Sequence, residues 1–149
     1  MEKMTLWEMC ERTCDAISGS PLNYYQGRWA TDAKAMFKVR GMTAFADEAC
    51  GTAYCRAGHM LSIAKNSHVT DETEISYQAR HMLQKAGISP AAIGMLFWGG
   101  ACNNAGKPGS AAYVAEGVNG LKRFMTEWEI QLKGHYTTGE KVEEGNGKS

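Results

Sequence analysis

The sequence lacks any run of about 18 apolar residues, the length that a membrane-spanning helix needs. Its first residues, Met1 to Met4, contain no apolar segment of the kind found in signal peptides. An excess of charge of either sign is also lacking, because 16 basic residues balance 16 acidic ones. A chain without a broad positive field is not expected to bind nucleic acid non-specifically. These absences predict a cytoplasmic protein whose partners include neither a membrane nor bulk nucleic acid.

A cysteine framework is lacking as well. The five cysteines are odd in number and widely spread, and no pair of compact Cys-x-x-Cys motifs is present. Reduced thiols in a cytoplasm fit this pattern. Cys55 and His59, four residues apart on a predicted helix, are weak candidates for metal ligands together with Cys50, but a structural zinc site needs four ligands. We therefore expect no metal and no other cofactor, and we interpret the cysteines as small buried apolar residues.

Helical periodicity recurs along the chain, and no alternating pattern of useful length predicts a strand. The length of 149 residues is typical of one domain that can bury a sizeable core. From Gly134 onward the sequence is polar and glycine-rich, without periodicity. The chain is therefore predicted to be all-α, with a compact bundle of about five helices in one domain over residues 1–133 and a flexible, disordered tail over residues 134–149.

Capping signals and apolar faces place the individual helices. The first is predicted to begin at Thr5, where Glu8 completes a capping box. Its buried face comprises Leu6, Met9, Cys10, Thr13, Cys14 and Ile17. Further helices are predicted over residues 71–86, 90–98 and 111–133, with a helical or irregular segment over 31–39 and a connection over 41–48. The short helix over 90–98 carries Ile93, Leu96, Phe97 and Trp98 on its apolar positions.

The stretch from Cys50 to Ala64 is the one around which the other helices are expected to pack. Gly51 and Thr52 offer a turn and a helix cap, and small and apolar residues dominate afterwards. One side of the predicted helix carries Ala53, Ala57, Leu61 and Ala64, and the other side carries Arg56, His59, Ser62 and Lys65. This arrangement predicts a central, buried helix over about residues 52–65.

Part of this stretch matches a sequence pattern of Cys-Gly-Thr-x-x-Cys-x-Ala-Gly followed by His or Trp, through the residues Cys50-Gly51-Thr52, Cys55 and Ala57-Gly58-His59. The pattern resembles a signature of small helical proteins of phages and bacteria, in which it opens a helix. The later order, with Leu96-Phe97, a glycine-rich loop and a long last helix, is similar too, so the likeness covers about residues 35–130. The resemblance implies a helical fold and a phage-type origin, hence the cytoplasm of a host cell, and it implies no particular activity.

Two loops carry candidate ligand-binding residues. The loop from Leu22 to Trp29 is rich in aromatic residues and contains Arg28, and such side chains stack on a flat base and hold a phosphate or carboxylate. The loop from Gly106 to Ser110 brings Lys107 and backbone N–H groups to the start of the last helix, where anions are attracted. It is not a nucleotide-binding Walker A loop, because Ala101 and Pro108 replace two required residues.

Together with a tryptophan and two amides, these loops could line a pocket of nucleotide size. The predicted ligand site comprises Tyr24, Tyr25, Arg28, Trp29, Trp98, Asn103, Asn104, Lys107 and Ser110. A purely structural interpretation stays open, in which Trp29 and one tyrosine fill the core and Ser110 only caps a helix. Tyrosine, tryptophan and arginine also dominate the energetically important positions of protein interfaces, so the same surface could bind a host protein.

Enzymatic alternatives rest on cysteine and histidine. Cys55 and His59 could form a thiolate–imidazolium pair, although no third, orienting group can be named. The histidines His59, His68, His81 and His135 could act as general acid and base in phosphodiester cleavage. We predict instead a non-enzymatic binding protein of phage type that interferes with a host process, such as host defence, by sequestering a small nucleotide-derived, anionic signalling molecule. The alternatives are a host-protein inhibitor acting by surface occlusion and a small phosphodiesterase-type hydrolase. A homo-oligomer is compatible with the sequence.

Overall fold

The computed structural model describes residues 3–98 and 106–137. Within these ranges the chain forms eight α-helices and one two-stranded sheet, so the predicted helical fold is confirmed. The α-helices are α1 (Leu6–Gly19), α2 (Ala33–Val39), α3 (Thr43–Glu48), α4 (Arg56–Lys65), α5 (Glu72–Lys85), α6 (Pro90–Trp98), α7 (Ala111–Glu127) and α8 (Glu129–Lys133). The strands are β1 (Ala30–Asp32) and β2 (Thr52–Tyr54), and a 3₁₀ turn, η1, spans Pro21–Asn23.

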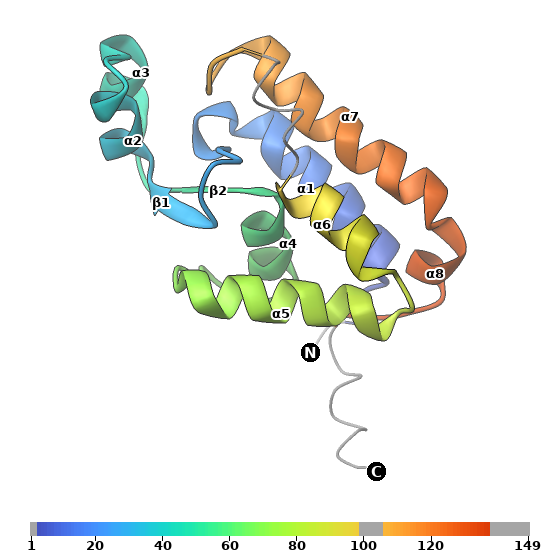
Figure 1. Cartoon of the computed structure of the whole chain (residues 1–149). Helices are drawn as coiled ribbons and strands as arrows, with labels where there is room; N and C mark the ends of the chain where they lie inside the picture. The colour runs from blue at the N-terminus through green and yellow to red at the C-terminus, as the bar shows by residue number, and fades with distance from the viewer. Residues whose placement is uncertain (1–2, 99–105, 138–149) are drawn as a thin grey trace.

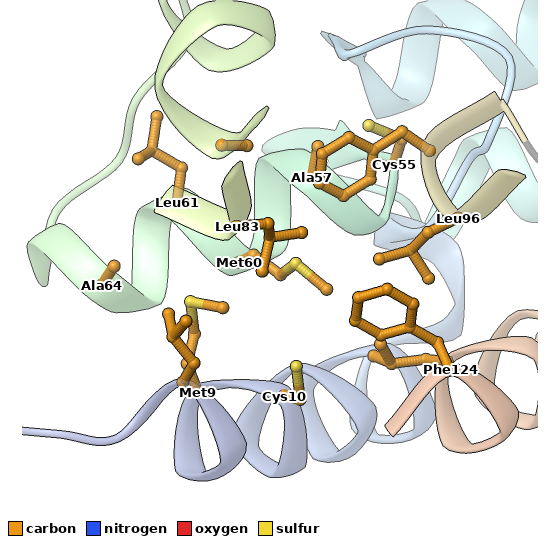
Figure 2. Packing of buried hydrophobic residues seen from close by; sticks show 14 of the residues in the cluster. Met9, Cys10, Cys55, Ala57, Met60, Leu61, Ala64, Leu83, Leu96 and Phe124 are labelled. Carbon is orange, nitrogen blue, oxygen red and sulfur yellow. The ribbon is translucent and has the colours of Figure 1, made fainter. Parts of the chain in front are cut away.

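Helix α4 lies between α1 and α5 and contacts both, and α1 packs in turn against α7 (Figure 1). Helices α2 and α3 form a smaller cluster next to the sheet. Figure 2 shows the dense packing around α4, with labelled side chains from α1, α4, α5, α6 and α7 that include Met9, Cys10, Met60, Leu83, Leu96 and Phe124. The predicted central, buried helix is therefore present.

Helix α1 follows its sequence prediction closely. The Thr5 hydroxyl accepts a hydrogen bond from the Glu8 backbone N–H at 3.0 Å, and the Glu8 carboxylate accepts one from the Thr5 backbone N–H at 2.9 Å. This reciprocal capping box satisfies two backbone donors at the helix start. All six residues that were predicted to face inward are buried.

The start of α4 differs from the prediction by several residues. Thr52–Tyr54 forms β2, which pairs antiparallel with β1 in the register Ala30 to Tyr54. Gly51 has a φ of +75°, a conformation that glycine adopts readily, and it turns the chain into the strand instead of into a helix. The helix therefore begins only at Arg56, after Cys55 in the cap position.

Arg56 and His59 were assigned to the polar side of this helix, yet both are buried, with 3% and 8% of their surfaces exposed. The Arg56 guanidinium donates to the backbone carbonyls of Leu96 at 2.7 Å and Gly117 at 3.0 Å. Gln26 donates its side-chain N–H to the neighbouring Phe97 carbonyl. Side chains from elsewhere thus satisfy two carbonyls at the end of α6, where the helix itself supplies no donor. Arg56 thereby joins α4, α6 and α7.

Differences also occur at the surface and near the C-terminal end. Trp98 was placed on the apolar positions of its helix but is 64% exposed. The predicted helix over 111–133 is divided at Trp128 into α7 and α8. The predicted connection over 41–48 contains α3. At the start of the predicted tail, the His135 carbonyl accepts from the Leu6 N–H at 2.8 Å, and residues 138–149 lie outside the described residues.

Candidate functional site

The two tyrosines of the predicted ligand site are engaged within the protein. Tyr24 is fully buried, and its hydroxyl donates to the Gln26 side-chain oxygen at 2.9 Å. The half-buried Tyr25 accepts a hydrogen bond from Arg40 at 2.9 Å, and the guanidinium lies 5.1 Å from the centre of the Tyr25 ring. In this conformation Tyr24 offers no surface to a ligand.

Arg28, predicted to hold a ligand's phosphate or carboxylate, contacts a carboxylate of the protein itself, that of Glu72 at the start of α5. The guanidinium donates to the two oxygens of Glu72 at 2.6 and 3.2 Å. The same carboxylate accepts from the backbone N–H groups of Trp29 at 3.1 Å and Ala30 at 3.3 Å. The hydrogen bond with Arg28 lowers the pKa of Glu72 below its ordinary value. Arg28 therefore fastens the aromatic loop to α5.

Trp29 and Trp98 are brought together, with ring centres 5.0 Å apart in an edge-to-face arrangement. Lys107 is exposed. Ser110 caps α7, because its hydroxyl accepts from the Tyr113 backbone N–H at 3.2 Å. Asn103 and Asn104 lie outside the described residues. A ligand site at this surface stays a prediction.

A cleft of about 560 Å³ lies elsewhere, between the end of α1, η1, β2 and α4. Its walls combine hydroxyls, amides, two imidazoles and a thiol. The lining residues are Ala16, Ser20, Asn23, Cys50, Gly51, Thr52, Tyr54, His59, Ser62, Ile63, Asn66, Ser67 and His68. Sequence reasoning grouped Cys50 with His59 as weak metal candidates and His59 with His68 as acid–base candidates, but it did not join all three in one site.

His59 projects from α4 into the wall of this cleft. Its Nε2 lies 3.0 Å from the backbone carbonyl of Asn23. Because a carbonyl oxygen can only accept, Nε2 must carry the proton of this hydrogen bond. Burial lowers the pKa of His59 to about 4, so the imidazole is neutral at pH 7. The side-chain amide of Asn23 also donates to the Cys50 and Thr52 carbonyls, at 2.8 and 3.0 Å, and so ties two walls of the cleft together.

Tyr54 contacts both histidines of the cleft. Its hydroxyl is 3.2 Å from Nδ1 of His68 and shares a hydrogen bond with it. Its ring lies edge-to-face on His59, with centres 5.3 Å apart, and stacks on His68 with centres 6.2 Å apart. The cleft thus presents a connected set of polar groups, supplied by β2, α4 and the segment after α4.

The cysteines of this region differ in accessibility. Cys55 is 2% exposed, and burial raises its pKa to about 11, so its thiol stays protonated at pH 7. With His59 also neutral, the two do not form the ion pair that a cysteine nucleophile needs. Cys50, in contrast, is exposed at the cleft. Across residues 3–98 and 106–137, no group of three or more His, Cys, Asp or Glu side chains is placed to hold a metal ion.

Comparisons of the chain with protein-family models, curated proteins and solved structures found no significant match. None of the helices in the described ranges combines the length and the apolar character needed to cross a lipid bilayer.

Proposed function

We propose that this protein is a small, non-enzymatic binding protein of phage type that holds a small nucleotide-derived molecule in the cleft between α1, β2 and α4. The observation that carries the proposal is the cleft itself, whose volume of about 560 Å³ lies within the usual range for small-molecule sites. Its two imidazoles and its hydroxyl groups supply the few polar contacts that orient such ligands. By withholding a signalling molecule, the protein would interfere with a host process such as defence.

Binding fits the cleft better than phosphodiester hydrolysis does. Cleavage requires groups that stabilise negative charge as it develops on the phosphoryl oxygens. Lys and Arg are missing from the described residues that line the cleft. His59 is also a weak base, because burial lowers its pKa to about 4. The ligand is therefore expected to leave the site chemically unchanged.

A second candidate function, occlusion of a host protein, is favoured by one observation on α6. This helix contains no charged side chain from Pro90 to Trp98. Two large apolar residues on it, Met95 and Trp98, are 78% and 64% exposed. Exposed apolar and aromatic side chains of this kind are typical of protein interfaces.

Calorimetric titration with a panel of nucleosides, nucleotides and cyclic dinucleotides tests the proposal and separates the two surfaces. The variant Ser62→Phe fills the cleft with a bulky side chain, and Trp98→Ala removes the exposed ring on α6. We expect a ligand to bind the wild type and Trp98→Ala but not Ser62→Phe, with both variants checked for folding by circular dichroism. Loss of binding only in Trp98→Ala would move the site to the aromatic surface, and absence of any ligand would refute the proposal. Mass spectrometry of the recovered ligand checks that it is unchanged.

A further inference from the structure

The described lining of the cleft between α1, β2 and α4 contains no acidic side chain and no lysine or arginine. Thirteen residues make up this lining. Charged residues make up 21% of the whole sequence. A second cleft of about 670 Å³, between α1 and α7, shows the contrast, because it is lined by Glu8, Glu11, Arg12, Asp15 and Lys122 among others. The first cleft therefore differs from the second in having no Lys, Arg, Asp or Glu in its described lining.

His59 fixes the direction of one hydrogen bond in this lining. Its Nε2 carries a proton and donates to the Asn23 carbonyl, so the neutral ring has its lone pair on Nδ1. Among the described residues no hydrogen bond involves His59 Nδ1. His59 is one of the residues that line the cleft, and 8% of its surface is exposed. The lone pair on Nδ1 is an acceptor that only an N–H or O–H group can satisfy.

A phosphate group does not suit such a site. Phosphate oxygens are acceptors, so they would face the lone pair of His59 Nδ1 without a hydrogen between them. Moving a charged group out of water is costly unless opposite charges and hydrogen bonds compensate it. The described lining supplies no Lys or Arg for this purpose. An uncharged group with several donors and acceptors meets neither obstacle.

We propose that the cleft binds the uncharged, hydrogen-bond-donating part of its ligand, a nucleoside, and that His59 Nδ1 accepts a hydrogen bond from an N–H or O–H of that nucleoside. Any phosphate groups stay in solvent at the mouth of the cleft. This inference rests on the proposed function, because it specifies which part of a nucleotide-derived molecule enters the same site. It makes His59 a specificity-determining residue.

The test uses adenosine, guanosine, cytidine and uridine beside their 5′-monophosphates. Cys50 reports on occupancy, since its exposed thiol lines the cleft and its alkylation by iodoacetamide slows when a probe covers it. Cys102, which lies outside the described residues, is replaced by serine in the protein used. We expect at least one nucleoside to protect Cys50, with its monophosphate binding within about threefold of the same affinity.

The variant His59→Gln tests the acceptor. Its side-chain amide can still donate to the Asn23 carbonyl, but it places no acceptor where Nδ1 lies. We expect nucleoside affinity to fall by about tenfold or more, as for a buried hydrogen bond left unmade. His81→Gln is the matched control, because His81 is an exposed histidine on α5 outside the cleft, and it should bind as the wild type does. Thermal unfolding of both variants shows whether the fold is kept, and a shift of the His59 Nδ1 nitrogen resonance in the wild type on nucleoside binding reports the contact directly.

The outcomes separate the inference from the proposed function. If only phosphate-bearing probes protect Cys50, the proposed function stands and the inference is wrong. If nucleosides protect Cys50 but His59→Gln binds them like the wild type, the role of Nδ1 is refuted. If no probe of either class protects Cys50, the proposed function falls and the inference falls with it.

Discussion

The buried imidazole of His59 makes the stability of the protein depend on pH in a defined window. Its pKa is about 4 in the folded protein, against an ordinary value of 6.5. Between these values the unfolded chain binds a proton that the folded chain does not, so the free energy of unfolding falls as the pH falls from 6.5 to 4. Above pH 7 both states are neutral and the effect disappears. The full difference of 2.5 units corresponds to about 3 kcal/mol.

Urea unfolding at pH 7 and pH 5 measures this effect when the wild type is compared with His59→Gln, which does not titrate. We expect the wild type to lose about 2 kcal/mol more than the variant between these pH values, which is a shift of about 1 M in the urea midpoint. Because both proteins contain the same other titratable groups, the comparison cancels the contribution of those groups to the pH dependence of stability. Glu72 is one of them, since its lowered pKa also reduces stability in acid.

Two results would refute this reasoning. Parallel loss of stability in both proteins would show that His59 does not carry the effect. A direct nuclear magnetic resonance titration in which His59 changes its charge near pH 6.5 would show that the ring is not enclosed as described. The exposed histidine variant His81→Gln serves as a control and should follow the wild type at both pH values.

Three further predictions concern packing and reactivity. Gly120→Ala should destabilise the fold by about 2–4 kcal/mol in urea unfolding, because the new methyl group would overlap the Arg56 guanidinium. Gly94→Ala, with ordinary space around it, should instead stabilise the fold by about 0.5–1 kcal/mol. A change of the same sign in both variants would contradict one of these two predictions. Cys50 should be alkylated in the native protein much faster than the buried described cysteines, as read by peptide mass spectrometry; similar rates would mean that the cleft wall is misplaced. Glu72→Ala removes the acceptor and should speed hydrogen exchange at the two backbone amides that donate to that carboxylate. Unchanged exchange would show that these amides have other acceptors.

The parts of the fold that the sequence predicted correctly depend on local signals. The capping box at Thr5 and the inward face of α1 involve residues three or four positions apart, which is the spacing that helical geometry brings together. Asp71 likewise caps α5, where its carboxylate accepts from the Glu74 backbone N–H at 3.1 Å. Such signals need no knowledge of the rest of the chain.

The errors arose where distant residues decide the outcome. Thr52–Tyr54 is a strand because Ala30–Asp32 pairs with it, and strands of three residues are too short to show an alternating pattern. Arg56 and His59 look solvent-exposed in a helical pattern, yet backbone carbonyls at distant positions in the chain accept their hydrogen bonds. The helical pattern identified a buried helix but not the polar contacts that cross it.

Local sequence patterns predict even less of the candidate site. Its walls come from residues 16–23, 50–54 and 59–68, which no local pattern links. Arg28 was predicted to bind an external anion, and that role stays a prediction; in the structure its guanidinium holds an internal carboxylate. The carboxylate is supplied by Glu72, 44 positions further along, so no local pattern in the sequence joins the two.

The way in which α6 ends has a consequence for the order of assembly. The carbonyls of Leu96 and Phe97 accept hydrogen bonds from Arg56 and Gln26, so the last turn of α6 depends on two side chains that lie earlier in the chain. During synthesis both donors leave the ribosome before the turn that they complete, and the last turn of α6 can dock on a surface that already exists. The same dependence makes it the turn that should fray first whenever α4 is disturbed.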